Sequence, residues 1–124
     1  MHDITPIWLT RNYITYGLMA GVRGPEQLFE PRGFPDGLQE GYIHREFASY
    51  GGYEPSWLTT QEIEAVHHHL MVWYDKHTDN PYLVEARPGF DLEVTAVLGA
   101  MRAVDAWCNL HDPGGQALLV FYFD

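Results

Sequence analysis

The chain has 124 residues and a formal net charge of −10, with 46% hydrophobic and 19% charged residues. These values indicate one folded domain, residues 1–124, and argue against a disordered tail, a membrane-spanning protein and a sequence-independent nucleic-acid binder. The single cysteine, Cys108, excludes an internal disulfide. The first residues lack the basic start and apolar run of a signal peptide, and both observations predict a cytoplasmic protein.

Both ends of the chain predict strands. Residues 3–10 show a loose alternation of apolar side chains, and residues 116–124, QALLVFYFD, form a continuous apolar and aromatic run after a turn. Because no other segment predicts a strand, we expect these two to pair in a small antiparallel sheet of two or a few strands. A sheet of this size is marginal alone, so helices or another subunit should cover it.

About four helices are predicted between the strands, which makes the expected fold class α+β. They cover roughly residues 12–20, 38–50, 59–77 and 91–110. The third helix has the clearest start, because the sequence TTQE from Thr59 has the form of a capping box.

The helix predicted over residues 91–110 is apolar nearly all round. One face carries Val94, Val97, Leu98, Met101, Val104 and Cys108, and the opposite side carries Leu92, Ala96, Gly99, Ala103 and Leu110, with Trp107 nearby. A helix of this kind is expected to be buried. We expect it to lie between its own sheet and a second subunit of a homo-oligomer, and burial within one chain is the alternative. The small residues would allow close approach of another helix.

The segment EAVHHHLMVWYDKH, residues 64–77, raises the question of a metal site. Three consecutive histidines spread over about 200° of a helix and cannot converge on one ion. Glu64 and His67 have the Glu-x-x-His spacing of di-iron helices, but no second such pair occurs in the sequence. We therefore predict no metal.

Residues for nucleophilic catalysis are scarce. Ser49 and Ser56 are the only serines, and neither lies in a Gly-x-Ser-x-Gly elbow. Cys108 falls on an apolar helix face, and no phosphate-binding glycine motif follows the first strand. The sequence therefore predicts no catalytic residues and no cofactor, and favours a binding protein over an enzyme.

Arginines and aromatic residues gather in residues 11–37, RNYITYGLMAGVRGPEQLFEPRGFPDG, within an otherwise acidic chain. Arginine forks suit phosphates, rings suit a nucleobase, and a helix start supplies further N–H groups. We predict that a small nucleotide binds there. The predicted ligand-binding residues are Arg11, Asn12, Tyr13, Tyr16, Arg23, Arg32, Trp57 and Arg102. In the alternative, the arginines cap helices or tie the loop to Glu26, Glu30 and Asp36.

Three segments carry a family resemblance: RNYITYGLMAGVRG, EPRGFPDG and SWLT, followed by an aromatic strand that ends in Asp124. This pattern resembles that of small proteins encoded by bacteriophages and prophages. The resemblance implies an early protein that counters host defence. One class of such proteins is the homo-oligomeric sponge of the Thoeris-inhibitor type, which sequesters cyclic ADP-ribose derivatives made by TIR-domain enzymes.

Two other functions remain open at this point. Residues 51–124 contain eleven acidic residues and only three basic ones. A surface with this excess of negative charge could mimic nucleic acid and block a basic host nuclease. Alternatively, His67 or His69 could act with carboxylates to hydrolyse a nucleotide signal.

Overall fold

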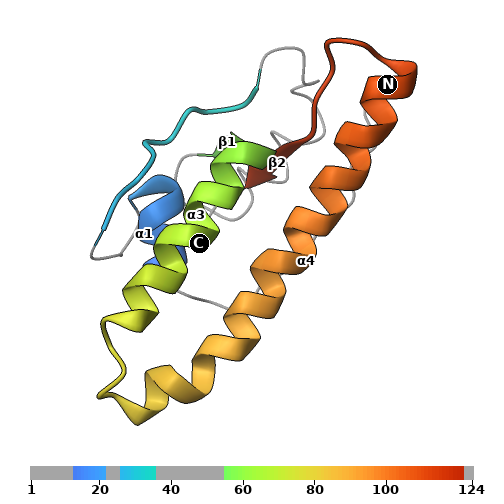
Figure 1. The fold of residues 1–124 in the computed structure, drawn as a ribbon. Helices are drawn as coiled ribbons and strands as arrows, with labels where there is room; N and C mark the ends of the chain where they lie inside the picture. The colour runs from blue at the N-terminus through green and yellow to red at the C-terminus, as the bar shows by residue number, and fades with distance from the viewer. Residues whose placement is uncertain (1–12, 22–25, 36–54, 122–124) are drawn as a thin grey trace, which may run out of the picture.

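The computed structural model describes residues 13–21, 26–35 and 55–121, and within these ranges it contains three helices and one two-stranded sheet (Figure 1). The elements are α1 (Tyr13–Ala20), β1 (Ser56–Thr59), α3 (Thr60–Asp75), α4 (Pro81–His111) and β2 (Leu118–Phe121). The predicted α+β class is confirmed. The strand predicted over residues 3–10 and the helix predicted over 38–50 lie outside the described residues.

The sheet joins β1 to β2 in an antiparallel register that places Ser56 opposite Phe121 and Thr59 opposite Leu118. The predicted strand after the turn is thus confirmed over Leu118–Phe121. The expectation that no strand lies between the two ends is wrong, because residues 56–59 form β1. Four residues are too few to show the alternation of apolar and polar side chains that predicts a strand. The capping box at Thr59 predicts the start of the helix and gives no sign of a strand before it.

α3 follows β1 without a linker, since Thr59 is both the last strand residue and the N-cap of the helix. The Thr59 hydroxyl accepts a hydrogen bond from the Glu62 N–H, and the Glu62 carboxylate accepts one from the Thr59 N–H. The predicted capping box is confirmed. One face of α3 is buried over four turns, at Ile63, Val66, Leu70 and Tyr74.

α4 begins ten residues before the predicted start. Asn80 is its N-cap and accepts hydrogen bonds from the N–H groups of Tyr82 and Leu83, while Pro81 occupies the first helical position. The helix continues through Pro88, which lies inside it. The cap and the proline at the helix start provide a sequence signal for the earlier beginning.

α3 lies between α1 and α4 and packs against both (Figure 1). The largest fully buried hydrophobic side chains come from α1, β1 and α3: Leu18, Leu58, Ile63, Val66 and Leu70. α4 contributes only one face to this core, through Val94, Val97, Leu98, Met101 and Cys108. The alternative of burial within one chain is therefore wrong for the described residues, because Leu92, Val104, Trp107 and Leu110 are exposed. Burial of this side against a second subunit stays a prediction.

Polar bonds join the sheet to the helices at one end of α4. Asp105 accepts a hydrogen bond from the Thr60 hydroxyl at 2.5 Å and another from the Ala117 N–H at 2.7 Å. One carboxylate thus connects α4, the start of α3 and the segment that enters β2. Among the described helices, none combines the length and the apolar content that crossing a bilayer requires.

Candidate functional site

Of the eight predicted ligand-binding residues, the structure brings two together. Arg32 and Trp57 are in contact, while Arg102 lies on α4 in a separate ion pair. Tyr13 and Tyr16 belong to α1, as predicted. Arg11, Asn12 and Arg23 lie outside the described residues.

The loop of residues 26–35 places Arg32 beside β1. The Arg32 N–H donates to the Ser56 hydroxyl at 3.0 Å, and the Gly33 N–H donates to the Pro55 carbonyl at 2.9 Å. Gly33 has a φ of 76°, which L-residues with side chains rarely adopt, so glycine suits this turn. At the other end of the loop, the N–H of Leu28 donates to the Leu18 carbonyl of α1. The loop is therefore held against both α1 and β1.

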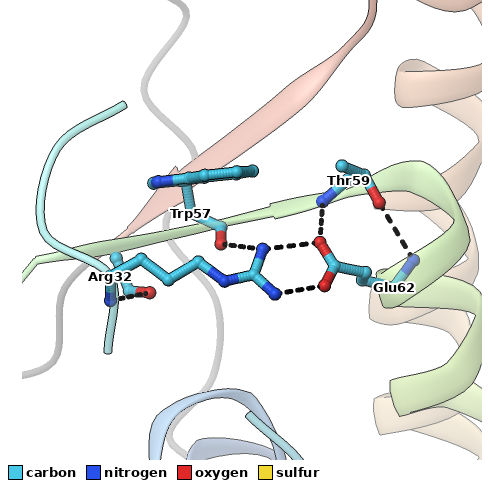
Figure 2. A network of polar contacts seen from close by, with 5 residues as sticks. Arg32, Trp57, Thr59 and Glu62 are labelled. Carbon is cyan, nitrogen blue, oxygen red and sulfur yellow. Dashed lines mark hydrogen bonds and ion pairs between the residues drawn. The ribbon is translucent and has the colours of Figure 1, made fainter. Parts of the chain in front are cut away.

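The Arg32 guanidinium makes a two-pronged contact with the Glu62 carboxylate (Figure 2). Nη1 donates to Oε1 at 2.7 Å, Nη2 pairs with Oε2, and Nη1 also donates to the Trp57 carbonyl at 3.4 Å. This parallel geometry is the one in which arginine binds carboxylate most strongly. The predicted alternative partners Glu26, Glu30 and Asp36 are near in sequence, but the partner found is in α3.

Two aromatic rings lie close to the Arg32 charge. The guanidinium carbon is 4.6 Å from the centre of the Trp57 ring and 5.5 Å from the centre of the Phe29 ring. Both distances are within the range of a cation–π interaction, and tryptophan is the strongest partner. Figure 2 shows the Trp57 ring lying over the arginine side chain. The site thus combines a planar cation, an indole ring and an anionic partner.

Glu62 serves two purposes at once, since it closes the capping box and neutralises Arg32. The hydrogen bonds from Arg32 hold the pKa of the Glu62 carboxyl below its ordinary value, and the Thr59 N–H acts in the same direction. The same pair raises the pKa of Arg32. Glu62 is therefore ionised at neutral pH and keeps both oxygens available as acceptors.

The other two arginines of the described chain are also paired. Arg102 donates to Glu64 at 3.1 Å, which joins α4 to α3, and Arg87 donates to Asp75 at 2.5 Å. The Arg102 pair is well exposed on both sides, so its contribution to stability is small. Glu64 follows Glu62 by two residues, which places it about 200° round α3, so the structure does not bring Arg102 to the Arg32 site.

The histidines of α3 do not form a common site. His67 contacts Asp91 of α4 at 2.6 Å, and this bond lowers the pKa of the Asp91 carboxyl. His68 and His69 are exposed and pack edge to face against each other. In the part of the chain that the structure describes, no three His, Cys, Asp or Glu side chains are arranged to hold a metal ion. The absence of a metal stays a prediction.

Sequence analysis named Arg32 and Trp57 but did not identify Glu62 as the partner of Arg32, or Asp105 as the acceptor that joins Thr60 to Ala117. The capping box signalled Glu62 as a helix-start residue, and nothing in a sequence links it to an arginine thirty positions earlier. No local pattern marks Asp105 as an acceptor for residues of two other segments. No protein-family model, curated protein or solved structure matches this chain.

The Arg32–Glu62 pair should make stability depend on pH in a defined window. Because the pKa of Glu62 is lower in the folded chain than in the unfolded chain, its contribution is present above about pH 4.3 and is lost as pH falls through the folded value. We expect Glu62→Gln to lower the free energy of unfolding by about 1–2 kcal/mol at pH 7. Glutamine retains the acceptor needed by the capping box.

The measurement is urea unfolding of the wild type and Glu62→Gln at several values between pH 7 and pH 3. The difference in unfolding free energy between the two proteins should shrink as pH falls. Asp91 titrates in both proteins, so its contribution cancels and the difference reports on Glu62. Parallel curves over this range would show that the pair contributes nothing.

Proposed function

We propose that this protein is a phage-encoded, non-enzymatic binding protein that sequesters a small phosphate-bearing nucleotide, of the cyclic ADP-ribose type, in the host cytoplasm, and that it assembles as a homo-oligomer. The observation that supports binding is the Arg32–Trp57 pair, in which the guanidinium carbon lies 4.6 Å from the centre of a half-buried indole ring. The family resemblance of the segments around both residues supports the class of ligand.

Glu62 has a defined place in this proposal. Its carboxylate meets Arg32 through two parallel hydrogen bonds, the same pattern with which arginine binds a phosphate. In the free protein, Glu62 therefore stands where a ligand phosphate would bind. A nucleotide that uses Arg32 has to displace Glu62, and the Trp57 ring then offers a surface for the base.

This competition gives the two residues of the pair opposite effects on binding. Arg32→Ala should weaken binding of cyclic ADP-ribose by roughly 10- to 150-fold, the equivalent of 1.5–3 kcal/mol for hydrogen bonds to a charged group. Arg32→Lys should restore part of the loss, since an ammonium lacks the fork. Glu62→Gln should tighten binding, because the competing anion is gone. Isothermal titration calorimetry on all four proteins provides the comparison.

Both Arg32→Ala and Glu62→Gln break the same ion pair, so they serve as matched controls for stability. If Arg32 only fastens the loop to α3, the two variants should lose similar amounts of stability, and both should bind cyclic ADP-ribose as tightly as the wild type. That result would overturn the role of Arg32 in phosphate binding. Ligand released by heat denaturation should be chemically intact. A hydrolysed product would favour the hydrolase alternative instead.

A further inference from the structure

Arg32 and Glu62 are each held in place by hydrogen bonds other than their own ion pair. The Arg32 N–H donates at 3.0 Å to the hydroxyl of Ser56, a residue that is completely inaccessible to solvent. Glu62 lies in the first turn of α3, where its carboxylate accepts from the Thr59 N–H at 3.0 Å. Because both residues are fixed independently, a ligand bound at Arg32 has the Glu62 carboxylate as its neighbour.

The Glu62 side chain has little freedom to move away from the site. Figure 2 shows its carboxylate between the Arg32 guanidinium and the start of α3. Oε1 accepts from both Arg32 and the Thr59 N–H, so a phosphate that takes the place of Glu62 on the guanidinium leaves the bond to Thr59 intact. Only 22% of the Glu62 side chain is exposed, which limits the directions in which it can turn. A displaced Glu62 therefore remains next to the bound phosphate.

Within the described residues, the charge at this site is one cation and one anion. Arg87 and Arg102 are paired with acidic residues elsewhere, and Lys76 lies at the opposite end of α3. A ligand phosphate with one negative charge can share the guanidinium of Arg32 with the tethered Glu62. A second negative charge on the same phosphate meets the carboxylate, and no cation of the described residues is placed to balance it.

Phosphate groups differ in charge according to how many of their oxygens are linked to other groups. An internal phosphate, linked on two sides, carries one negative charge. A terminal phosphate carries close to two at pH 8, because its second pKa is about 6. Both kinds offer two oxygens to an arginine fork, so the fork alone does not distinguish them. A carboxylate beside the fork does, because it repels the doubly charged group more strongly.

We propose that Glu62 is a specificity-determining residue of the Arg32 site, which selects nucleotides whose phosphates are all internal and disfavours nucleotides that end in a free phosphate. This inference rests on the proposed function and specifies the chemical class of its ligand. Two unit charges about 5 Å apart, in surroundings between bulk water and a protein surface, repel each other enough to change an affinity by roughly 10-fold. That factor is the expected size of the selection.

ADP-ribose and ADP are a suitable pair of ligands for the test. Both contain adenosine and two phosphates, but both phosphates of ADP-ribose are internal, whereas ADP ends in a free phosphate. Isothermal titration calorimetry at pH 8 and low salt measures the two affinities. The wild type should bind ADP-ribose about 10-fold more tightly than ADP, because the extra charge of ADP lies beside Glu62.

Two glutamine variants separate the local charge of Glu62 from the charge of the whole protein. Glu62→Gln keeps the acceptor of the capping box and should bring the ratio of the two affinities close to one, through a larger gain for ADP than for ADP-ribose. Glu64→Gln is the matched control, because it removes the same charge two residues further along α3, from a side chain that pairs with Arg102. It should leave the ratio unchanged.

Salt distinguishes charge repulsion from contacts with the second ribose of ADP-ribose. Repulsion between partly exposed charges is screened as ionic strength rises, so the preference of the wild type for ADP-ribose should become smaller in high salt. A preference that is the same at all salt concentrations would come from the ribose and would overturn the role of Glu62.

Arg32→Ala separates failure of this inference from failure of the proposed function. If binding depends on Arg32 but the wild type binds ADP as tightly as ADP-ribose, only the inference is overturned. The same holds if the ratio is equal in the wild type and Glu62→Gln, or if Glu62→Gln and Glu64→Gln change it equally. If Arg32→Ala weakens the binding of neither nucleotide, the proposed function fails and this inference fails with it.

Discussion

Leu70→Ala should destabilise this protein by about 3–5 kcal/mol, the upper part of the range for a buried leucine truncated to alanine. Leu70 is completely inaccessible to solvent and lies on the buried face of α3, the helix that packs against both α1 and α4. Removal of its side chain leaves a cavity that helices on two sides cannot easily fill. A loss of this size is a large share of the stability of a small domain.

Urea unfolding followed by circular dichroism measures the effect. The midpoint should fall while the slope with denaturant stays constant, which indicates a change in stability rather than in the unfolded state. Val84→Ala is the control, because Val84 is half exposed on α4, so the loss of stability should remain below about 0.5 kcal/mol. Similar losses for both variants would show that α3 is not the centre of the core.

Asp105→Ala should cost about 2–3 kcal/mol, because it leaves two nearly buried donors without their acceptor. The Ala117 N–H and the Thr60 hydroxyl both donate to this carboxylate, and the residues that carry them are 4% and 9% exposed. A buried donor that loses its partner costs about 1–3 kcal/mol. The segment around Ala117 should also open more easily than the rest of the fold, because Asp105 binds the N–H of the residue that precedes β2.

Asp105→Asn provides the matched comparison. The amide oxygen can still accept from Ala117, and the amide nitrogen can donate to the Thr60 oxygen, so most of the stability should return. Hydrogen exchange at the Ala117 amide reports on the local bond: it should be fast in Asp105→Ala and slow in Asp105→Asn. Equal protection in both variants would show that the carboxylate does not hold this segment.

The features predicted correctly from the sequence are those with a strong local signal. The capping box identified the start of α3. A continuous apolar run identified β2. In each case, neighbouring residues within a few turns carry all the information required.

The features that the sequence did not predict depend on contacts between distant segments. β1 is too short to show a period and is a strand only because β2 lies beside it. The pairing of Arg32 with Glu62 follows from the placement of the loop against α3, which no local pattern encodes. For the same reason, local acids such as Glu30 were the expected partners. Asn80 before Pro81 was a local signal for the earlier start of α4, and the prediction did not use it.

The distance in sequence between the two strands also bears on the order in which the parts of the fold form. β1 and β2 are about sixty residues apart in sequence, and bringing such distant segments together carries a large loop-closure entropy in an unfolded chain. α3 and α4 are joined by a short turn and pack against each other, so they can form a helical hairpin early and at low entropic cost. That hairpin shortens the gap that the strands have to close. We therefore expect the sheet to be the last part of the described fold to form, after the helices have placed its two strands side by side.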